Sequence, residues 1–73
     1  MIGTMDNNVN ITTEYIKLDQ LLKFSGAVAI GSDAKELILS GKVMVNGQPC
    51  LVRGKKIYSG DVVTVNGNEI TVH

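Results

Sequence analysis

The sequence contains few of the residue types that build disulfides, metal centres or catalytic sites. Its 73 residues include one cysteine, Cys50, one histidine, His73, one proline and no tryptophan. A single cysteine cannot form an intrachain disulfide, and a structural zinc ion takes about four Cys or His ligands, so both are excluded. A lone thiol suits a reducing compartment. The sequence therefore predicts a small domain that depends on its hydrophobic core.

Long hydrophobic runs are also missing. None is long enough to span a membrane, and residues 1–10 contain no basic residue, so they do not resemble a signal peptide. Hydrophobic residues still make up 44% of the chain, with 16 Val and Ile against 6 Leu, which is too many for a disordered chain. We expect a monomeric cytoplasmic protein with a flexible leader at residues 1–10 and a single domain at residues 11–73.

The first clear periodic pattern is helical. Leu18, Leu21 and Leu22 stand at positions i, i+3 and i+4, which places them on one face of a helix. Gly26 follows as a residue that can adopt the left-handed conformation at a helix end. The pattern predicts a helix over residues 18–25.

A second helix is predicted over residues 33–40. Ser32 or Asp33 can cap it, and with Asp33 as the cap Glu36 completes a capping-box spacing. Gly41 is positioned to end the helix. Its expected buried stripe consists of Ala34, Leu37 and Ile38.

The remaining segments predict β-strands. A short strand is expected over residues 11–16, and two more over residues 43–45 and 62–65, each followed by an Asn-Gly turn and a return strand. Pro49 cannot donate a ladder hydrogen bond, so the returning segment at residues 50–52 is expected to be an edge or irregular strand. The predicted fold class is α+β, with two short helices packed on a small antiparallel β-sheet.

No set of residues fits a catalytic mechanism. His73 is the last residue, where fraying would disturb a positioned base, and Cys50 has no histidine partner, so it is interpreted as a structural thiol. The spacing of Asp33 and Glu36 suits helix capping better than acid–base chemistry. We expect no enzymatic activity, no catalytic residue, no cofactor and no metal.

The charges are balanced in number but not in position. Seven basic and seven acidic residues give a net charge of zero. All seven basic residues lie between positions 15 and 56 with only three acidic ones, so that window carries a charge of +4. One cationic face could result, although scattered solvated lysines would give the same numbers. Charge alone leaves both possibilities open.

Six basic residues are candidates for phosphate contacts. Arg53, Lys55 and Lys56 crowd into one turn, where like charges repel unless a partner neutralises them. Lys35 is expected in the first turn of the second helix, where free N–H groups also favour an anion. The other two candidates, Lys17 and Lys23, flank the first helix. The alternative for the crowded turn is an exposed hairpin tip that lysines keep soluble.

Three segments together resemble one known module. They are Leu-Asp-Gln-Leu-Leu at residues 18–22, Ala-Lys-Glu-Leu-Ile-Leu-Ser-Gly-Lys-Val-Met-Val-Asn-Gly at residues 34–47, and Gly-Asp-Val-Val at residues 60–63. The chain resembles the RNA-binding domain of the ribosomal small-subunit protein four type, also called the alpha-L motif, over roughly residues 17–65. Residues 14–20 and 53–63 resemble its small stand-alone bacterial, ribosome-associated members.

The resemblance implies an L formed by two helices and a β-hairpin, with its concave side on folded RNA. It implies a non-catalytic protein that recognises structured RNA, ribosomal RNA or ribosomal particles, through backbone and shape. The implied contacts come from Lys17, Lys23, Lys35, Arg53, Lys55 and Lys56. The alternative is a protein–protein adaptor that docks on a ribosomal or RNA-processing partner.

The sequence departs from the pattern of this family at two places. Lys17 stands where an Arg often precedes Leu-Asp, which keeps the charge but loses the bidentate fork. Ile30 and Gly31 stand where a Ser-Arg pair is usual, which removes a helix cap and an RNA contact. The aromatic residues, Tyr15, Phe24 and Tyr58, are interpreted as core or core-edge residues rather than as stacking platforms.

Overall fold

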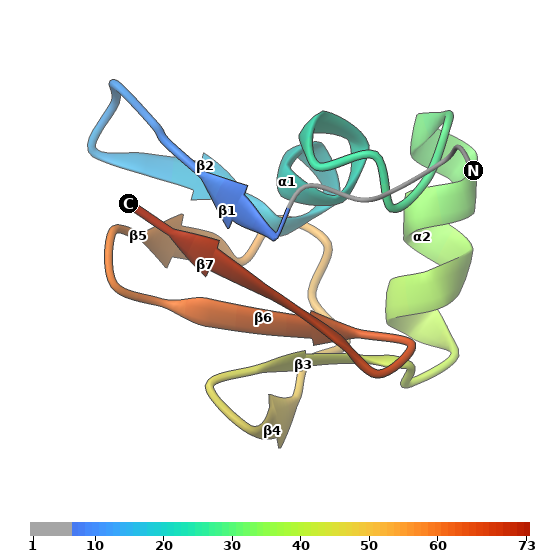
Figure 1. Ribbon diagram of the computed structural model, residues 1–73. Helices are drawn as coiled ribbons and strands as arrows, with labels where there is room; N and C mark the ends of the chain where they lie inside the picture. The colour runs from blue at the N-terminus through green and yellow to red at the C-terminus, as the bar shows by residue number, and fades with distance from the viewer. Residues whose placement is uncertain (1–6) are drawn as a thin grey trace, which may run out of the picture.

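The computed structural model describes residues 7–73 and has a small α+β fold with two helices packed on a β-sheet, as predicted. In Figure 1 the strands of the larger sheet run side by side, and α2 stands at one end of them, next to α1. The helices are α1 (Leu18–Phe24) and α2 (Gly31–Leu39). The strands are β1 (Asn8–Val9), β2 (Tyr15–Lys17), β3 (Val43–Val45), β4 (Gln48–Pro49), β5 (Lys56–Tyr58), β6 (Val62–Val65) and β7 (Asn68–Val72).

The larger sheet has five strands in the order β1-β7-β6-β3-β4. Its pairs are antiparallel except β1 with β7, which is parallel, so the sheet is mixed rather than purely antiparallel. The prediction of a flexible leader is wrong for Asn8 and Val9, because they pair with Thr71 and Val72 and the Val9 side chain is buried. Residues 1–6 of that predicted leader lie outside the described residues.

The C-terminal residue is held by β1. The backbone N–H of His73 donates to the Val9 carbonyl at 2.8 Å, and its ring Nε2 lies 2.8 Å from Oδ1 of Asn8. The Ile11 N–H in turn donates to the carbonyl of His73 at 3.0 Å. The expectation that this histidine frays is therefore wrong, since both backbone groups and the ring have partners.

Helix α1 forms where its leucine pattern predicts it. Leu18, Leu21 and Leu22 are fully buried on one face. The helix ends in a Schellman motif, in which Gly26 has φ 85° and the Ala27 N–H donates to the Leu22 carbonyl at 3.0 Å. The predicted C-terminal stop is confirmed.

Helix α2 begins at Gly31, two residues before the predicted start at residue 33. Its N-cap is Ile30, in an extended conformation and without a side-chain cap, and the Ile30 carbonyl accepts the N–H groups of Asp33 and Ala34. Asp33 already lies inside the helix, so it cannot act as the N-cap, and the capping-box prediction is wrong. Its carboxylate still lies in the first turn, at the positive end of the helix dipole.

Both Asn-Gly turns form as predicted. Asn46 and Gly47 have φ values of 52° and 84°, and Asn66 and Gly67 have 51° and 83°. Two successive positive φ angles are characteristic of the tight turn that joins antiparallel strands, and Asn and Gly are the residues that tolerate them best. The edge strand β4 consists of Gln48 and Pro49, whereas residues 50–52, where the sequence predicts the returning strand, form no strand, so the predicted bounds are wrong.

A second sheet, which the sequence did not predict, pairs β2 with β5 in antiparallel orientation. We call this pair the β2–β5 ribbon. The strand expected over residues 11–16 is confined to Tyr15–Lys17, because only these residues find a partner strand. Ile16 lies opposite Ile57, whose side chain is fully buried, so this pair faces the core.

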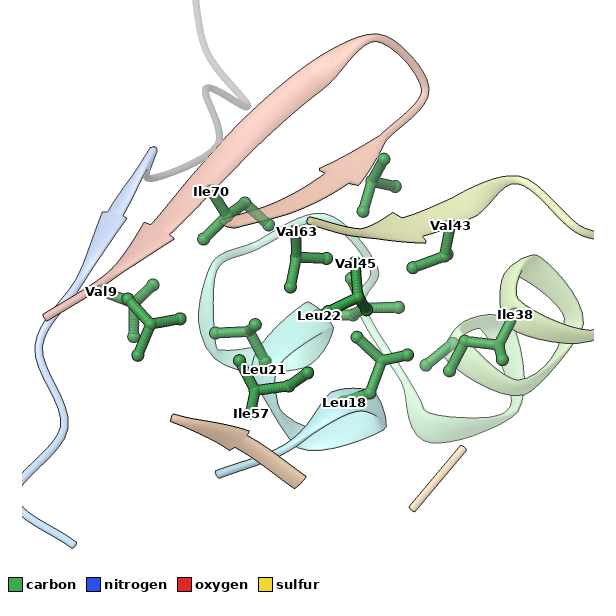
Figure 2. Packing of buried hydrophobic residues seen from close by; sticks show 13 residues of the cluster. Val9, Leu18, Leu21, Leu22, Ile38, Val43, Val45, Ile57, Val63 and Ile70 are labelled. Atoms are coloured by element: carbon green, nitrogen blue, oxygen red, sulfur yellow. The ribbon is translucent and has the colours of Figure 1, made fainter. Parts of the chain in front are cut away.

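The hydrophobic core joins both helices, the sheet and the ribbon. Figure 2 shows Leu22 of α1 close to Val45 and Val63 of the sheet, and Leu21 next to Ile57 of β5. Cys50 is half-buried and packs against this cluster, which agrees with its interpretation as a structural thiol.

The carboxylate of Asp61 connects two parts of the fold. Its Oδ2 accepts the Tyr58 N–H at 2.8 Å, and its Oδ1 accepts Nδ2 of Asn46 at 3.2 Å. Asn46 completes the connection by accepting the Val62 N–H at 2.9 Å. Asp61 thereby ties the end of β5 to the turn between β3 and β4.

We expect Asp61→Ala to lower the free energy of unfolding by about 1–2 kcal/mol, because two hydrogen bonds to a carboxylate are lost at a half-buried site. Urea denaturation measures the change. Glu69→Ala removes one exposed carboxylate from β7 and is the matched control. Equal stability of the two variants would contradict this role of Asp61.

Candidate nucleic-acid interface

We call residues 53–56, which include Arg53, Lys55 and Lys56, the basic turn. This turn is anchored through its backbone to the N-terminus of α1. The N-cap residue Lys17 makes no side-chain capping bond. The Leu18 N–H donates instead to the Lys55 carbonyl at 2.9 Å, and the Asp19 N–H donates to the Arg53 carbonyl at 3.1 Å. These bonds satisfy two of the donors that a helix N-terminus leaves free. Both bonds use backbone carbonyls of the turn rather than its side chains.

The outer face of the β2–β5 ribbon carries two tyrosines and two lysines. Strand residues alternate between faces, so the inward Ile16 and Ile57 leave four neighbours on the opposite side. We call this set the ribbon face: Tyr15 opposite Tyr58, and Lys17 opposite Lys56. Like charges directly opposite each other are destabilising. The free protein thus carries a local repulsion that a bound anion would relieve.

The aromatic rings of the ribbon face are in contact. The ring centroids of Tyr15 and Tyr58 are 5.9 Å apart with an interplanar angle of 55°. The Lys56 ammonium lies 5.0 Å from the Tyr15 centroid, within the range of a cation–π contact. Tyr15 is half-buried, whereas Tyr58 is 42% exposed and Phe24 is 63% exposed. The prediction of core or core-edge positions is wrong for Phe24 and Tyr58.

A groove of about 580 Å³ runs between the β3–β4 hairpin and the segment that leads into β5. We call it the hairpin groove. Its lining includes the polar Gln48, the apolar Leu51 and Val52, and three residues of the basic turn and ribbon face, Lys55, Lys56 and Tyr58. The groove therefore combines an apolar wall with two ammonium groups and the carboxylate of Asp61.

All six predicted contact residues are exposed, but the structure does not gather them all. Strand pairing and the two anchoring bonds bring the segments with Lys17, Arg53, Lys55 and Lys56 to the N-terminal end of α1. The other two lie elsewhere: Lys23 is in the last turn of α1, and Lys35 lines a separate groove along α2 with Lys42.

Lys35 does not occupy the expected first turn of α2. The helix begins at Gly31, so Lys35 is its fifth residue and lies in the second turn. The idea that its ammonium group joins free N-terminal N–H groups is therefore wrong, although a phosphate contact by its side chain stays a prediction.

The sequence interpretation missed the two tyrosines of the ribbon face. A signal was available in the patterns Tyr-Ile-Lys at residues 15–17 and Lys-Ile-Tyr at residues 56–58. Each places one aliphatic residue between two amphipathic ones, which is the alternation of a strand with one buried face.

The described residues offer little to other kinds of site. Within residues 7–73, no group of three or more His, Cys, Asp or Glu side chains could hold a metal ion. In the same part of the chain, no helix has the length and apolar character needed to cross a membrane.

Comparisons with known proteins show the family and the fold of this chain. The chain is 41% identical over 63 residues to the probable ribosome maturation protein RlbA of Bacillus subtilis (strain 168). This match covers 86% of this chain and 89% of RlbA. The solution structure of YbcJ from E. coli is described as having an alpha-L motif involved in RNA binding. It superposes on this structure with a TM-score of 0.71. The two sequences are 29% identical, and the match covers 99% of this chain and 95% of YbcJ. The resemblance to the alpha-L motif is confirmed. A family model for the S4 domain matches residues 9–73, and the chain belongs to the S4 domain family.

Proposed function

We propose that this protein is a non-catalytic, ribosome-associated RNA-binding protein that recognises structured RNA through backbone and shape. The observation that carries the proposal is the gathering of Lys17, Arg53, Lys55 and Lys56 at one end of α1, on an anchored turn and a paired ribbon. The relatives support it, since RlbA is described as a probable ribosome maturation protein and the alpha-L motif of YbcJ as involved in RNA binding.

The physical chemistry of double-helical RNA suits this arrangement. Its major groove is too deep and narrow for side chains, so proteins recognise its phosphates, 2′-hydroxyl groups and shape. Lysine ammonium groups act as compact point charges that contact phosphates without a strict geometry, and Arg53 adds a planar fork for one of them. The ribosome presents many such helices, and the proposed partners are ribosomal RNA or ribosomal particles in the cytoplasm, bound by a monomer.

Binding to structured ribosomal RNA fragments should weaken steeply with salt. Each phosphate contact contributes about −0.7 to −0.9 to the slope of log K against log salt, so the four gathered cations predict a slope of roughly −3 to −4. Fluorescence anisotropy over a range of salt concentrations measures it. A DNA duplex of matching sequence is the control, because it lacks the 2′-hydroxyl groups and the A-form shape.

A slope near zero would contradict the RNA proposal. It would favour the adaptor alternative instead, because the burial of an apolar protein–protein interface depends far less on salt than phosphate binding does.

A further inference from the structure

The ring of Tyr58 lies on the outer side of the β2–β5 ribbon. Tyr58 is 42% exposed, whereas the neighbouring Ile57 is fully buried. A base that stacks on an exposed aromatic ring gains free energy whatever its identity, because every base has a π-face. The exposed ring of Tyr58 is therefore a candidate surface for a nucleobase.

The surroundings of Tyr58 hold its backbone and brace its ring. The backbone is fixed by pairing with Tyr15 and by the bond from its N–H to the Asp61 carboxylate. The Tyr15 ring meets the Tyr58 ring at 55°, as in a tilted aromatic pair. Lys56 lies over the Tyr15 ring and so occupies that surface. Of the two tyrosines, Tyr58 is the one whose ring remains available to a ligand.

The hairpin groove gives a base a place beside this ring. Its volume of about 580 Å³ falls within the range of roughly 300–1,000 Å³ typical of small-ligand pockets. Leu51 and Val52, both more than half exposed, form its apolar wall. Lys55 and Lys56 line the same groove and complement a phosphate, and the exposed amide of Gln48 can hydrogen-bond a base edge.

We propose that the hairpin groove and the ribbon face hold one unpaired nucleotide of the bound RNA. The base stacks on Tyr58 against Leu51 and Val52, and its flanking phosphates contact Lys55 and Lys56. A base inside a continuous duplex cannot reach this groove, so the target is a helix that carries a bulge, a loop or a junction. This inference rests on the proposed function and adds a specificity that backbone and shape recognition lacks.

The test compares two RNA hairpins with the same stem, one fully paired and one with a single-nucleotide bulge. The unmodified protein should bind the bulged hairpin about 5- to 150-fold more tightly, the equivalent of one base–aromatic stack. Tyr58→Ala should lose this preference while it keeps the parent affinity and salt dependence for the paired stem. Tyr58→Phe keeps an aromatic ring and should retain the preference. Leu39→Ala, which shortens an exposed apolar side chain on α2, is the control.

A second readout uses the unmodified protein and does not depend on how the variants fold. A 2-aminopurine placed at the bulge should lose emission on binding, because stacking on Tyr58 quenches it. Unchanged emission would overturn the inference, and so would a Tyr58→Ala protein that still prefers the bulge. If one of these two results occurs while the paired stem is still bound in a salt-dependent manner, the proposed function is unaffected. If the unmodified protein shows no salt-dependent binding to either hairpin, the proposed function itself is contradicted.

Discussion

Neutralising Arg53, Lys55 and Lys56 together, as Arg53→Gln, Lys55→Gln and Lys56→Gln, should flatten the salt dependence of RNA binding by roughly 2–3 units of slope. Three phosphate contacts would disappear, each with its share of released counterions. The fold should be unaffected, because the turn is held through the carbonyls of Arg53 and Lys55, which the substitutions leave in place. Removing three like charges from one segment also relieves repulsion in the free protein.

The measurement is a salt titration of binding to structured ribosomal RNA fragments, with circular dichroism to verify the fold. Lys42→Gln serves as the control, since Lys42 follows α2 and lines a different groove, and its slope should change by at most about one unit. A triple variant with the parent affinity and slope would show that the turn is only solvated. The result would then favour the protein–protein adaptor function over RNA binding.

Leu22→Ala should bring the domain close to complete unfolding. The Leu22 side chain is fully buried at the centre of the core, and truncation of such a leucine costs about 2–5 kcal/mol through lost burial and a residual cavity. A domain of this size has a free energy of unfolding of only about 5 kcal/mol. Thermal and urea denaturation of the variant measure the loss.

Two further leucines on α2 provide graded comparisons for this prediction. Leu37→Ala should cost less than Leu22→Ala, because Leu37 is only half-buried. Leu39→Ala should change stability by about 0.5 kcal/mol or less, since Leu39 is 55% exposed. A Leu22→Ala melting temperature equal to that of the parent would mean that α1 does not pack on the sheet as described.

The local elements of this fold were predictable because their signals are local. The leucines of α1 repeat within one turn, and Gly26 and both Asn-Gly turns supply the positive φ angles that their positions need. The pairing of β2 with β5 joins residues about 40 positions apart, and that of β1 with β7 more than 60 apart. No short-range pattern encodes such partners, because they depend on how the whole chain closes.

The candidate site likewise has a part that the local sequence predicts and a part that only long-range strand pairing creates. The crowding of Arg53, Lys55 and Lys56 is visible in the sequence, whereas the position of Lys17 opposite Lys56 exists only through the unpredicted ribbon. The sequence interpretation places Tyr58 in the core or at its edge, because aromatic residues in small domains usually contribute there. The structure differs because the strand register turns Ile57 inward and therefore Tyr58 outward.

The two hydrogen bonds from α1 to the basic turn also affect the entropy of binding. A flexible loop that orders on a ligand loses about 1–2 kcal/mol of backbone conformational freedom per residue at that moment. Here the carbonyls of Arg53 and Lys55 are already fixed by the N–H groups of Asp19 and Leu18, so this loss occurs during folding. The turn is preorganised: an incoming phosphate has only to immobilise side chains, and more of the electrostatic attraction is retained as affinity.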